Sequence, residues 1–385
     1  MEISGKVRRP RRGITDFQWL RTGDEAFVAM LEAIDRAHQT VRFETYIFER
    51  GEPGDRFRAA LIRAVQRGVK VYALVDAWGS MELPVDYWDP LIHVGGEFRW
   101  FNKQRFLKGT FRNHRKLLVV DDRIAYCGGY NVAGDHLGDG INWGWRDVGL
   151  LLNGGLARSL GETFDRMFMR AELKHRSFLR VMKTGAHKKI ELPDGQIILS
   201  GPGRGFSRLR KSLKADLKKA NRVQIMAAYF LPTYRLRVFL AKLAQQGVRV
   251  QLILPGKSDV ALSQWASHRL YHTLLKNGIE IYEYQPQVLH AKLVIIDDAV
   301  YVGSANLDTR SLHINYELSL RIENPTMAEA ARQVFDDSLK HSTRIHLKTW
   351  RRSRDFIDRW REKIAYWLLA RFDLYLARKQ LIDLR

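Results

Sequence analysis

Helix-like and strand-like hydrophobic patterns alternate along the chain, and the same pair of patterns occurs twice. Residues 26–37 carry apolar side chains at helical spacing and precede the apolar run 41–47, which predicts a helix followed by a buried strand. Residues 208–220 precede the run 223–229 in the same way. Because helices that alternate with strands build α/β folds, the sequence predicts an α/β segment in each half.

A second helix–strand pair repeats at a fixed distance. Gly68 ends a helical pattern before the apolar run that ends at Asp76, and Gly247 does the same before the run that ends at Leu254. Glycine is favoured just after a helix because it adopts the left-handed conformation without steric cost. The two glycines are 179 residues apart, which indicates an internal duplication.

The duplication includes a motif of chemically active residues. The pattern His-x-Lys-x4-Asp occurs at 114–121 and again, 176 residues later, at 290–297. Each copy leads into a second apolar strand that ends in Gly-Gly-x-Asn (128–131) or Gly-Ser-x-Asn (303–306). One copy would be weak evidence, because a short motif arises by chance. Two copies at nearly the offset of the helix–strand repeat indicate two lobes that each carry half of one site.

The repeated histidines and lysines suit an anionic substrate. Residues two apart in a strand share a face, so His114 points with Lys116 and His290 with Lys292. Lysine supplies a fixed positive charge for phosphate oxygens, and histidine acts as nucleophile or proton carrier near neutral pH. If the pairs face each other, one histidine attacks phosphorus while the other protonates the leaving oxygen. Fixed cations then do the work of a metal, so the sequence predicts that no metal is needed.

Five further residues are predicted to support this site. Asn131 and Asn306, with Ser304 beside the latter, are expected to stabilise the phosphate oxygens in the transition state. An attacking histidine also needs a carboxylate on its other ring nitrogen. Asp147, 33 residues after His114, and Glu317, 27 residues after His290, are the candidates.

Other polar residues receive structural interpretations. Asp121 and Asp297 complete the catalytic motif, but they end their strands, so we interpret them as partners of cations or backbone, with a chemical role as the alternative. Cys127 occupies the strand position of Val302 and is interpreted as a small buried hydrophobic residue. Histidines outside the repeated motif are interpreted as structural; they are His93, His136, His268, His272 and His313.

Charge narrows the class of partner. The chain of 385 residues has 64 Lys+Arg against 42 Asp+Glu, a net charge of +22, which predicts a polyanionic partner such as nucleic acid or an anionic membrane surface. A single cysteine excludes a disulfide framework and a cysteine-rich zinc site. Charges interrupt every stretch of about 18 residues, so no helix is expected to span a bilayer. The first residues lack the apolar region of a secretory signal.

The doubled motif with its Gly-Gly/Ser-x-Asn elements resembles the phospholipase D superfamily. Residues 303–312 and 315–317 resemble bacterial cardiolipin synthases in particular, as do the strands at 44–48 and 229–232. The resemblance implies two tandem α/β/α lobes related by a pseudo-twofold axis, one shared active site, a covalent phosphohistidine intermediate and no cofactor. It implies His114 as the attacking group and His290 as acid/base, with the reverse assignment open.

The resemblance also implies a substrate. A phosphatidyl group would be held on histidine and passed to the glycerol hydroxyl of phosphatidylglycerol, which makes cardiolipin. A lipid hydrolase of the phospholipase D type, in which water is the acceptor, is the alternative. A nuclease is disfavoured because the match and the tryptophan-rich C-terminal part indicate lipid. Many members begin with two membrane-spanning helices. Because none is expected here, the chain resembles the shorter B-type branch.

The predicted domain bounds separate two lobes from three other segments. They are a basic tail (1–13), a first lobe (14–170), a linker (171–193), a second lobe (194–340) and a basic helical tail (341–385). The last tail has apolar residues at helical spacing among arginines, namely Phe356, Trp360, Ile364, Trp367 and Leu368. Such a helix binds the headgroup layer of an anionic membrane or packs on the second lobe. We expect a peripheral protein on the cytoplasmic side of a bacterial inner membrane.

Overall fold

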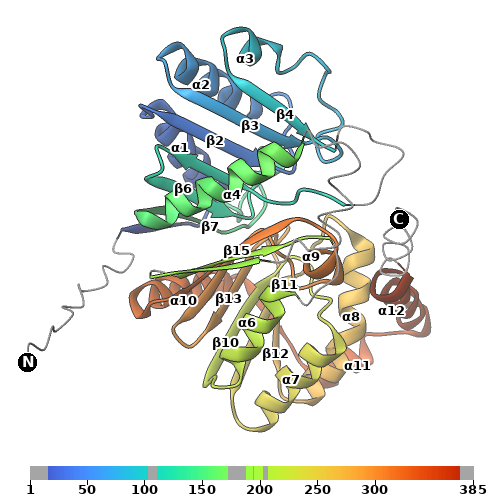
Figure 1. Ribbon diagram of the computed structural model, residues 1–385. Coiled ribbons are helices and arrows are strands. Elements are labelled where there is room, and N and C mark those ends of the chain that lie inside the picture. Colours follow the sequence, from blue (N-terminus) through green and yellow to red (C-terminus); the bar gives the residue numbers. More distant parts are fainter. Residues whose placement is uncertain (1–15, 103–110, 172–187, 194, 203–206, 373–385) are drawn as a thin grey trace, which may run out of the picture.

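The structure is a computed structural model that describes residues 16–102, 111–171, 188–193, 195–202 and 207–372 (Figure 1). The predicted N-terminal tail (1–13) lies outside these ranges, as do most of the predicted linker and the end of the predicted C-terminal tail. The described residues form two β-sheets with helices packed on both faces of each, one sheet per predicted lobe.

The first sheet has seven strands in the order β1-β7-β6-β5-β2-β3-β4. Neighbours in the group β2-β3-β4 are parallel, and all other neighbours are antiparallel. Its strands are β1 (Phe17–Leu20), β2 (Thr40–Thr45), β3 (Lys70–Asp76), β4 (Glu97–Phe101), β5 (Leu117–Val120), β6 (Ile124–Gly128) and β7 (Gly149–Asn153). The helices of this lobe are α1 (Gly23–Asp35), α2 (Gly54–Gln66), α3 (Asp89–His93), the short 3-10 helix η1 (Gly134–His136) and α4 (Gly155–Ala171).

The second sheet has nine strands in the order β16-β12-β11-β10-β13-β14-β15-β9-β8, and β10-β11-β12 are its parallel group. Its strands are β8 (Lys188–Leu192), β9 (Gly195–Ser200), β10 (Arg222–Ala227), β11 (Arg249–Pro255), β12 (Glu280–Tyr284), β13 (Lys292–Ile296), β14 (Ala299–Gly303), β15 (Glu317–Glu323) and β16 (Ser342–Ile345). The helices are α6 (Arg208–Leu217), α7 (Tyr234–Gln245), α8 (Ala261–Lys276), α9 (Thr309–His313), α10 (Pro325–Lys340), α11 (Leu347–Arg352), α12 (Phe356–Trp367) and the short η2 (Leu368–Phe372).

Capping residues explain where two of the predicted helices begin. The helix predicted from residue 26 begins three residues earlier, because the side chain of Thr22 accepts a hydrogen bond from the backbone N–H of Glu25. The start of α6 is as predicted, and the Ser207 side chain caps it through the N–H of Arg210. Side-chain caps therefore set the starts of both helices.

The second lobe is larger than the predicted bounds. Helix α10 follows β15 as α4 follows β7, so the repeat also includes the helix after the last strand of each motif region. Strand β8 lies within the predicted linker and β16 within the predicted tail, and both extend the second sheet. These strands are partly exposed edges with little apolar patterning, which explains why periodicity did not reveal them.

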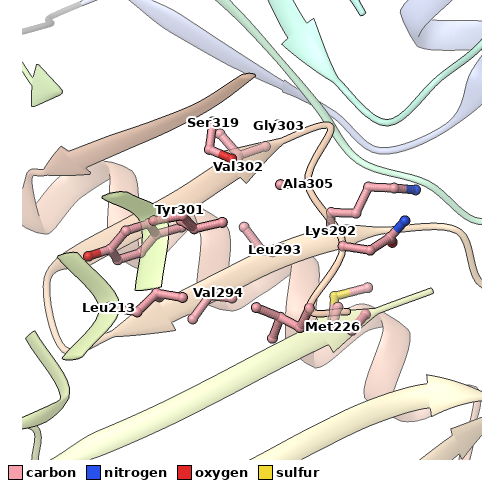
Figure 2. Close-up of a pocket in the computed structure, with 14 residues that line it drawn as sticks. Leu213, Met226, Lys292, Leu293, Val294, Tyr301, Val302, Gly303, Ala305 and Ser319 are labelled. Atoms are coloured by element: carbon pink, nitrogen blue, oxygen red, sulfur yellow. The ribbon is translucent and has the colours of Figure 1, made fainter. Parts of the chain in front are cut away.

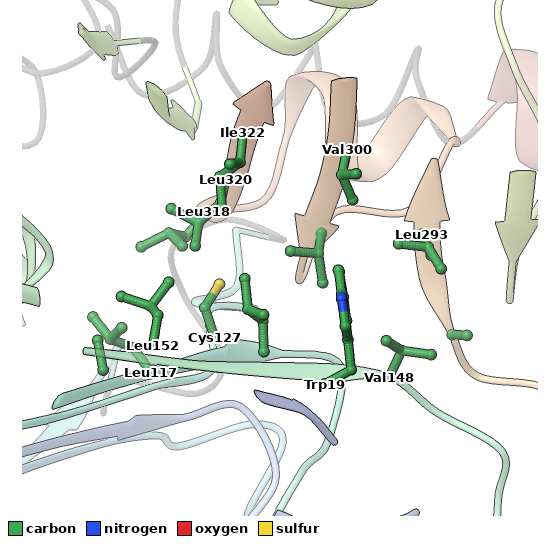
Figure 3. Close-up of a cluster of buried hydrophobic side chains, with 14 of the residues drawn as sticks. Trp19, Leu117, Cys127, Val148, Leu152, Leu293, Val300, Leu318, Leu320 and Ile322 are labelled. Atoms are coloured by element: carbon green, nitrogen blue, oxygen red, sulfur yellow. The ribbon is translucent and has the colours of Figure 1, made fainter. Parts of the chain in front are cut away.

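One hydrophobic core joins the lobes. Side chains of β5, β6 and β7 from the first sheet meet side chains of β13, β14 and β15 from the second, and α4 and α10 complete the cluster. Figure 3 shows Leu117, Cys127 and Leu152 opposite Leu318 and Leu320. Because this core is shared, the surfaces that carry the two motifs are held against each other.

Separate cores cover the outer faces. Helices α1, α2 and α3 pack on the first sheet, and α6, α7 and α8 on the second. The fold is the predicted α/β architecture of two tandem lobes with C-terminal helices. Cys127 is buried at the position of Val302, as expected, and burial raises the pKa of its thiol to about 12. Among the described helices, none is both long enough and apolar enough to cross a bilayer.

Candidate active site

The two motif histidines sit at the ends of buried strands. His114 precedes β5 and His290 precedes β13, and both strands are buried along their whole length because their side chains are apolar on both faces. The second motif residue of each pair, Lys116 or Lys292, is also buried. The sheet interiors therefore hold the two motifs rigidly, as the strand pattern predicted.

Backbone hydrogen bonds lock each motif onto the other lobe. The N–H of His114 donates to the carbonyl of Tyr316 at 3.0 Å, and the N–H of His290 donates to the carbonyl of Arg146 at 2.7 Å. Both bonds belong to short parallel bridges between the lobes. Tyr316 directly precedes Glu317, and Arg146 directly precedes Asp147. Each bridge thus delivers a carboxylate to the histidine of the opposite lobe.

The histidine–carboxylate pairs are exchanged between lobes. His114 Nδ1 lies 3.1 Å from Glu317 Oε2, and His290 Nδ1 lies 2.6 Å from Asp147 Oδ2. The sequence named both carboxylates but placed each one downstream of the histidine of its own half, and the structure corrects that placement. A carboxylate on Nδ1 fixes the ring and leaves Nε2 as the nitrogen available to a substrate.

Hydroxyl donors keep Glu317 ionised. Burial would raise the pKa of its carboxyl, but His114, Lys116 and Ser304 more than offset that effect and hold the pKa below its ordinary value. Ser304 donates to Oε2 at 2.5 Å and Ser311 donates to Oε1 at 2.8 Å. Ser304, predicted to support phosphate, therefore acts on the carboxylate.

Asp147 has fewer donors. Its Oδ1 accepts the backbone N–H of Val148 at 2.7 Å, and burial raises the pKa of its carboxyl although Lys292 and His136 oppose the change. Gly129 lies so close that a Cβ atom there would come within 2.1 Å of Asp147 Oδ1. A side chain at Gly129 of the Gly-Gly element would therefore collide with this carboxylate.

Burial favours the neutral form of both histidines. Burial lowers the pKa of His114, and the Glu317 carboxylate only partly opposes this. Burial together with Lys292, Lys116 and His114 lowers the pKa of His290 well below its ordinary value. The exchanged pairs and the backbone bonds between the lobes bring the two motifs together, and the charges of Lys116 and His114 act on His290. A neutral imidazole is the form that attacks phosphorus.

The two lysines supply the positive charge. Lys116 Nζ donates to the carbonyl of His114 at 2.8 Å, and Lys292 Nζ donates to the carbonyl of His290 and lies against its ring. Burial and the neighbouring Lys292 lower the pKa of Lys116 to about 7. In the protein without substrate, Lys116 is therefore about half protonated near neutral pH.

Lys116 is expected to limit activity at alkaline pH. With a pKa of about 7, its ammonium is lost above neutrality, so kcat/KM should fall as pH rises past 7. An anionic substrate stabilises the ammonium, so kcat should fall only at higher pH. Lys116→Arg keeps the charge at every pH used and should shift the alkaline fall of kcat/KM upward by at least one unit. Initial rates in mixed micelles from pH 5.5 to 9.5 measure both limbs. An unchanged alkaline limb in the Arg variant would contradict this assignment.

The two motif asparagines have different surroundings. Asn131 Nδ2 donates to His136 Nε2 at 3.1 Å and its Oδ1 accepts the N–H of Ile47 at 3.2 Å, so protein groups occupy the amide that was expected to face phosphate. Asn306 is buried, and its Oδ1 has no hydrogen-bond partner among the described residues. Of the two motif asparagines, Asn306 is therefore the one whose side-chain oxygen can accept a hydrogen bond from a substrate or water.

A small pocket extends from this side of the site into the second lobe. Its lining includes the polar residues Lys292 and Asn306. Figure 2 shows Lys292 on the opposite side of the pocket from Leu213 and Tyr301. Its interior volume of about 20 Å³ is large enough for one water molecule, which needs roughly 10–15 Å³. The pocket is too small for an acyl chain.

The motif aspartates do not reach the histidines. Asp121 accepts backbone N–H bonds from His38, Gln39 and Thr40 at 2.7–2.9 Å, and Asp297 binds the N–H groups of residues 221 and 222. Both lie at the far ends of β5 and β13 from the histidines. Their grouping with the catalytic residues is corrected: they join their strands to the start of the neighbouring strand, which agrees with the structural interpretation.

Sequence reasoning missed two aromatic residues and one histidine. The Tyr46 ring lies 5.0 Å from His114 and the Tyr229 ring 6.4 Å from His290, measured between centroids. Tyr46 directly follows β2 and Tyr229 lies two residues after the end of β10, so a tyrosine close to the end of each strand was the available signal. The His136 ring lies 5.0 Å from His290. No repeated motif marks it, which is why it was assigned to the structural histidines.

One trio has the spacing of metal ligands among the described residues. Ligand atoms of His136, Asp147 and His290 lie within 4.8 Å of one another. The Lys292 ammonium lies 2.8 Å from His290 Nδ1, and Lys116 also acts on both rings. Two buried positive charges oppose a metal cation, so this donor set fits an anion better.

Comparison with known proteins agrees with this geometry. The family model described as "Cardiolipin synthase, PLD-like domain" matches residues 30–139 and 213–339, which is well over half of the chain and includes both motifs. The chain belongs to this family. The two matched segments correspond to the two lobes.

Similar proteins cover most of the chain. Cardiolipin synthase 1 of Bacillus cereus is 33% identical over 350 residues, 87% of this chain and 69% of that protein. Cardiolipin synthase B of Salmonella typhi is 32% identical over 322 residues, 82% and 78% of the two chains. The crystal structure of phosphatidylserine synthase from Haemophilus influenzae superposes with a TM-score of 0.69 at 16% identity and covers 94% of both chains. The last likeness shows the fold.

Proposed function

We propose that this protein is a cardiolipin synthase, a phosphatidyltransferase that uses phosphatidylglycerol as donor and acceptor. The exchanged pairs His114–Glu317 and His290–Asp147 carry the proposal. They present two oriented imidazoles to one site that also holds two buried lysines, in a chain that belongs to the cardiolipin synthase family.

In the proposed reaction, His114 Nε2 attacks the phosphorus of the first phosphatidylglycerol. The bond from phosphorus to the glycerol oxygen breaks, and that oxygen takes a proton from His290. The anionic substrate offsets the lysine charges and so raises the pKa of His290 enough for it to carry this proton. The hydroxyl of a second phosphatidylglycerol then loses its proton to His290 and attacks the phosphohistidine. Two phosphatidylglycerols thus give one cardiolipin and one glycerol, and His114 is regenerated.

Burial supports lipid transfer over hydrolysis. The side chains of His114 and His290 are only 11% and 5% exposed. A phosphohistidine formed here has little contact with bulk water, whereas a lipid alcohol delivered from a membrane reaches it directly. A lipid hydrolase of the same fold is the second candidate. Water could attack the phosphohistidine in place of the lipid alcohol, and this step would need only the residues named above.

Radiolabelled phosphatidylglycerol tests the proposal. Vesicles containing lipid labelled in the headgroup and acyl chains should give cardiolipin and free glycerol in equal amounts, and the His114→Ala protein should give neither. Phosphatidic acid as the sole lipid product would replace the transferase with the hydrolase. Cleavage of oligonucleotides with no change in lipid would exclude both.

Chelators should leave this activity unchanged. Lys116 and Lys292 supply the charge stabilisation that a metal provides in other phosphotransferases, so the proposed scheme needs none. The same vesicle assay in 5 mM EDTA, after overnight dialysis, should run at the rate of the untreated protein. Activity lost in EDTA and restored by one divalent metal would contradict the scheme.

We further propose that the C-terminal tail binds an anionic membrane surface, on the cytoplasmic side of the inner membrane. Helix α12 packs on α8, and Glu362 and Ala365 on its inner side are buried. Glu362 lies beside Arg354, and Tyr366 accepts a hydrogen bond from Arg237 of α7 at 2.9 Å. The aromatic side of α12 faces outward. We name the exposed residues here the aromatic surface; they are Trp265, Phe356, Ile357, Trp360 and Trp367.

Charge and position favour a membrane as the partner of the aromatic surface. The exposed residues Arg359, Arg361 and Lys363 lie among its members, and Arg361 stacks over Trp265 at 5.9 Å. Aromatic side chains ringed by basic ones bind anionic headgroups. Helix α8 begins two residues after Asp259, which accepts the hydroxyl of Tyr229 at 2.5 Å.

Removing two tryptophans should weaken membrane binding without inactivating the site. Trp360→Ala with Trp367→Ala is expected to lower the partition coefficient on phosphatidylglycerol vesicles at least tenfold, because each indole buries apolar area in the interface. Co-sedimentation measures this, and Trp143→Ala, an equally exposed tryptophan in the first lobe, is the matched control. Unchanged binding of the double variant would exclude this surface.

A further inference from the structure

The internal repeat gives each carboxylate a different set of donors. Two positions correspond between the halves when the motif asparagines are aligned: Gly129 with Ser304, two residues before the asparagine, and His136 with Ser311, five residues after it. In the second half both serines donate to Glu317, one to each carboxylate oxygen. The carboxylate that holds His114 therefore has two hydroxyl donors.

The first half lacks both hydroxyls. Gly129 has no side chain, and Asp147 fills the space that one would need. The remaining position holds His136, whose Nδ1 lies 3.8 Å from Asp147 Oδ2. Its ring is 1% exposed and is enclosed by Tyr130, Trp145 and His290. A histidine thus stands beside Asp147 where a serine stands beside Glu317.

Hydrogen bonds fix which nitrogen of His136 carries the proton. The backbone N–H of Ile47 can only donate, so the Asn131 oxygen accepts it and the Asn131 amide N–H points to His136 Nε2. Nε2 is then the acceptor of a neutral ring, and the proton lies on Nδ1. Nδ1 has no hydrogen-bond partner among the described residues and faces Asp147.

We propose that His136 is a positioning residue for His290. Its Nδ1–H, oriented by Asn131, faces Asp147 Oδ2 from 3.8 Å and stabilises the ionised carboxylate beside His290 electrostatically, from the position that Ser311 has beside Glu317. This inference rests on the proposed function only for the role of His290. The groups that act on the Asp147–His290 pair from the surrounding elements are His136, Lys292, Lys116 and His114.

The consequence concerns proton affinity. A donor that stabilises the Asp147 anion lowers the proton affinity of the Asp147–His290 pair. Without it, the pair takes up a proton at higher pH and Asp147 no longer fixes the Nδ1–H tautomer of His290. The pH at which the pair gains its proton should then rise, and turnover should fall because His290 is no longer held in one tautomer, while KM for lipid stays constant.

Three substitutions of His136 separate this role from packing. His136→Phe keeps the ring and removes both nitrogens, His136→Asn keeps a donor near the Nδ1 position, and His136→Gln keeps a polar group near the Nε2 position. The Phe and Gln variants are expected to lose 10- to 100-fold in kcat, and the pH at which the Asp147–His290 pair gains its proton, followed by the ¹⁵N shifts of His290, should rise by half a pH unit or more. The Asn variant should regain most of both. Ser311→Ala is the matched control, because it should disturb His114 and leave His290 unchanged.

Histidine ¹⁵N NMR of the substrate-free protein gives a readout that does not depend on activity. The wild type and His136→Asn should show a single Nδ1–H tautomer for His290, and the Phe and Gln variants a mixture of tautomers. If the wild type makes no cardiolipin but these spectra differ as described, the proposed function fails and this inference stands. If Phe and Gln variants show the wild-type pH profile and tautomer, or if Asn rescues no better than Gln, the inference is overturned. Circular dichroism identifies any variant that does not fold, and the remaining variants then decide.

Discussion

Loss of either motif histidine should abolish phosphatidyl transfer in a protein that remains folded. His114→Ala removes the attacking nitrogen and His290→Ala removes the proton carrier, so each should lower kcat by at least about 10³-fold. The double variant should be no worse than the singles, because the two groups act as one unit. Transfer of label from phosphatidylglycerol to cardiolipin measures all three. A residual rate above about 1% in either single variant would contradict the shared site.

The same variants identify the attacking histidine. In a phosphatidyl ester of p-nitrophenol, the leaving group is p-nitrophenolate, which needs no proton. A protein that has only the attacking histidine should therefore still form the covalent phosphohistidine from this ester. We expect His290→Ala to accumulate this adduct and His114→Ala to show none. The reverse result would assign the attack to His290. An adduct in neither variant, with a burst in the wild type, would exclude a single attacking histidine.

A buried ion pair beside the first motif should dominate stability in that lobe. Arg115 Nη2 lies 3.0 Å from Glu44 Oε2, both side chains are buried, and Asn113 also donates to Glu44 at 2.7 Å. Glu44→Met leaves an unpaired buried guanidinium and should lower the free energy of unfolding by about 3–5 kcal/mol. Urea unfolding at pH 7 measures the change.

The second lobe provides the control for this prediction. Glu44 is paired with Leu117 as Met226 is paired with Leu293, and Arg115 corresponds to Ala291, so the second lobe uses an apolar pair at these two positions. Glu44→Met combined with Arg115→Met should therefore be more stable than Glu44→Met alone by at least about 2 kcal/mol. Additive losses in the double variant would mean that the pair contributes no coupling.

Local patterns predicted the strand cores and the duplication well. Strands such as β5 and β13 are apolar on both faces, and burial between helix layers is the arrangement that such runs permit. Edge strands β8 and β16 escaped notice because half-exposed strands carry little apolar signal. For α12, helical spacing identified the aromatic side but not its direction, which depends on the opposite side, where Glu362 and Ala365 are buried and Glu362 lies beside Arg354.

The amino-acid sequence alone established two related lobes, the two His–Lys pairs and the carboxylates that serve them, because repetition and strand alternation are properties of the chain. The tertiary structure decided which carboxylate serves which histidine. The backbone before each histidine bonds to the backbone before the carboxylate of the other lobe, at Tyr316 and Arg146. The place of His136 against Asp147 depends on the same interface. Contacts between segments that are far apart along the chain follow from how the lobes pack, and no local pattern encodes that.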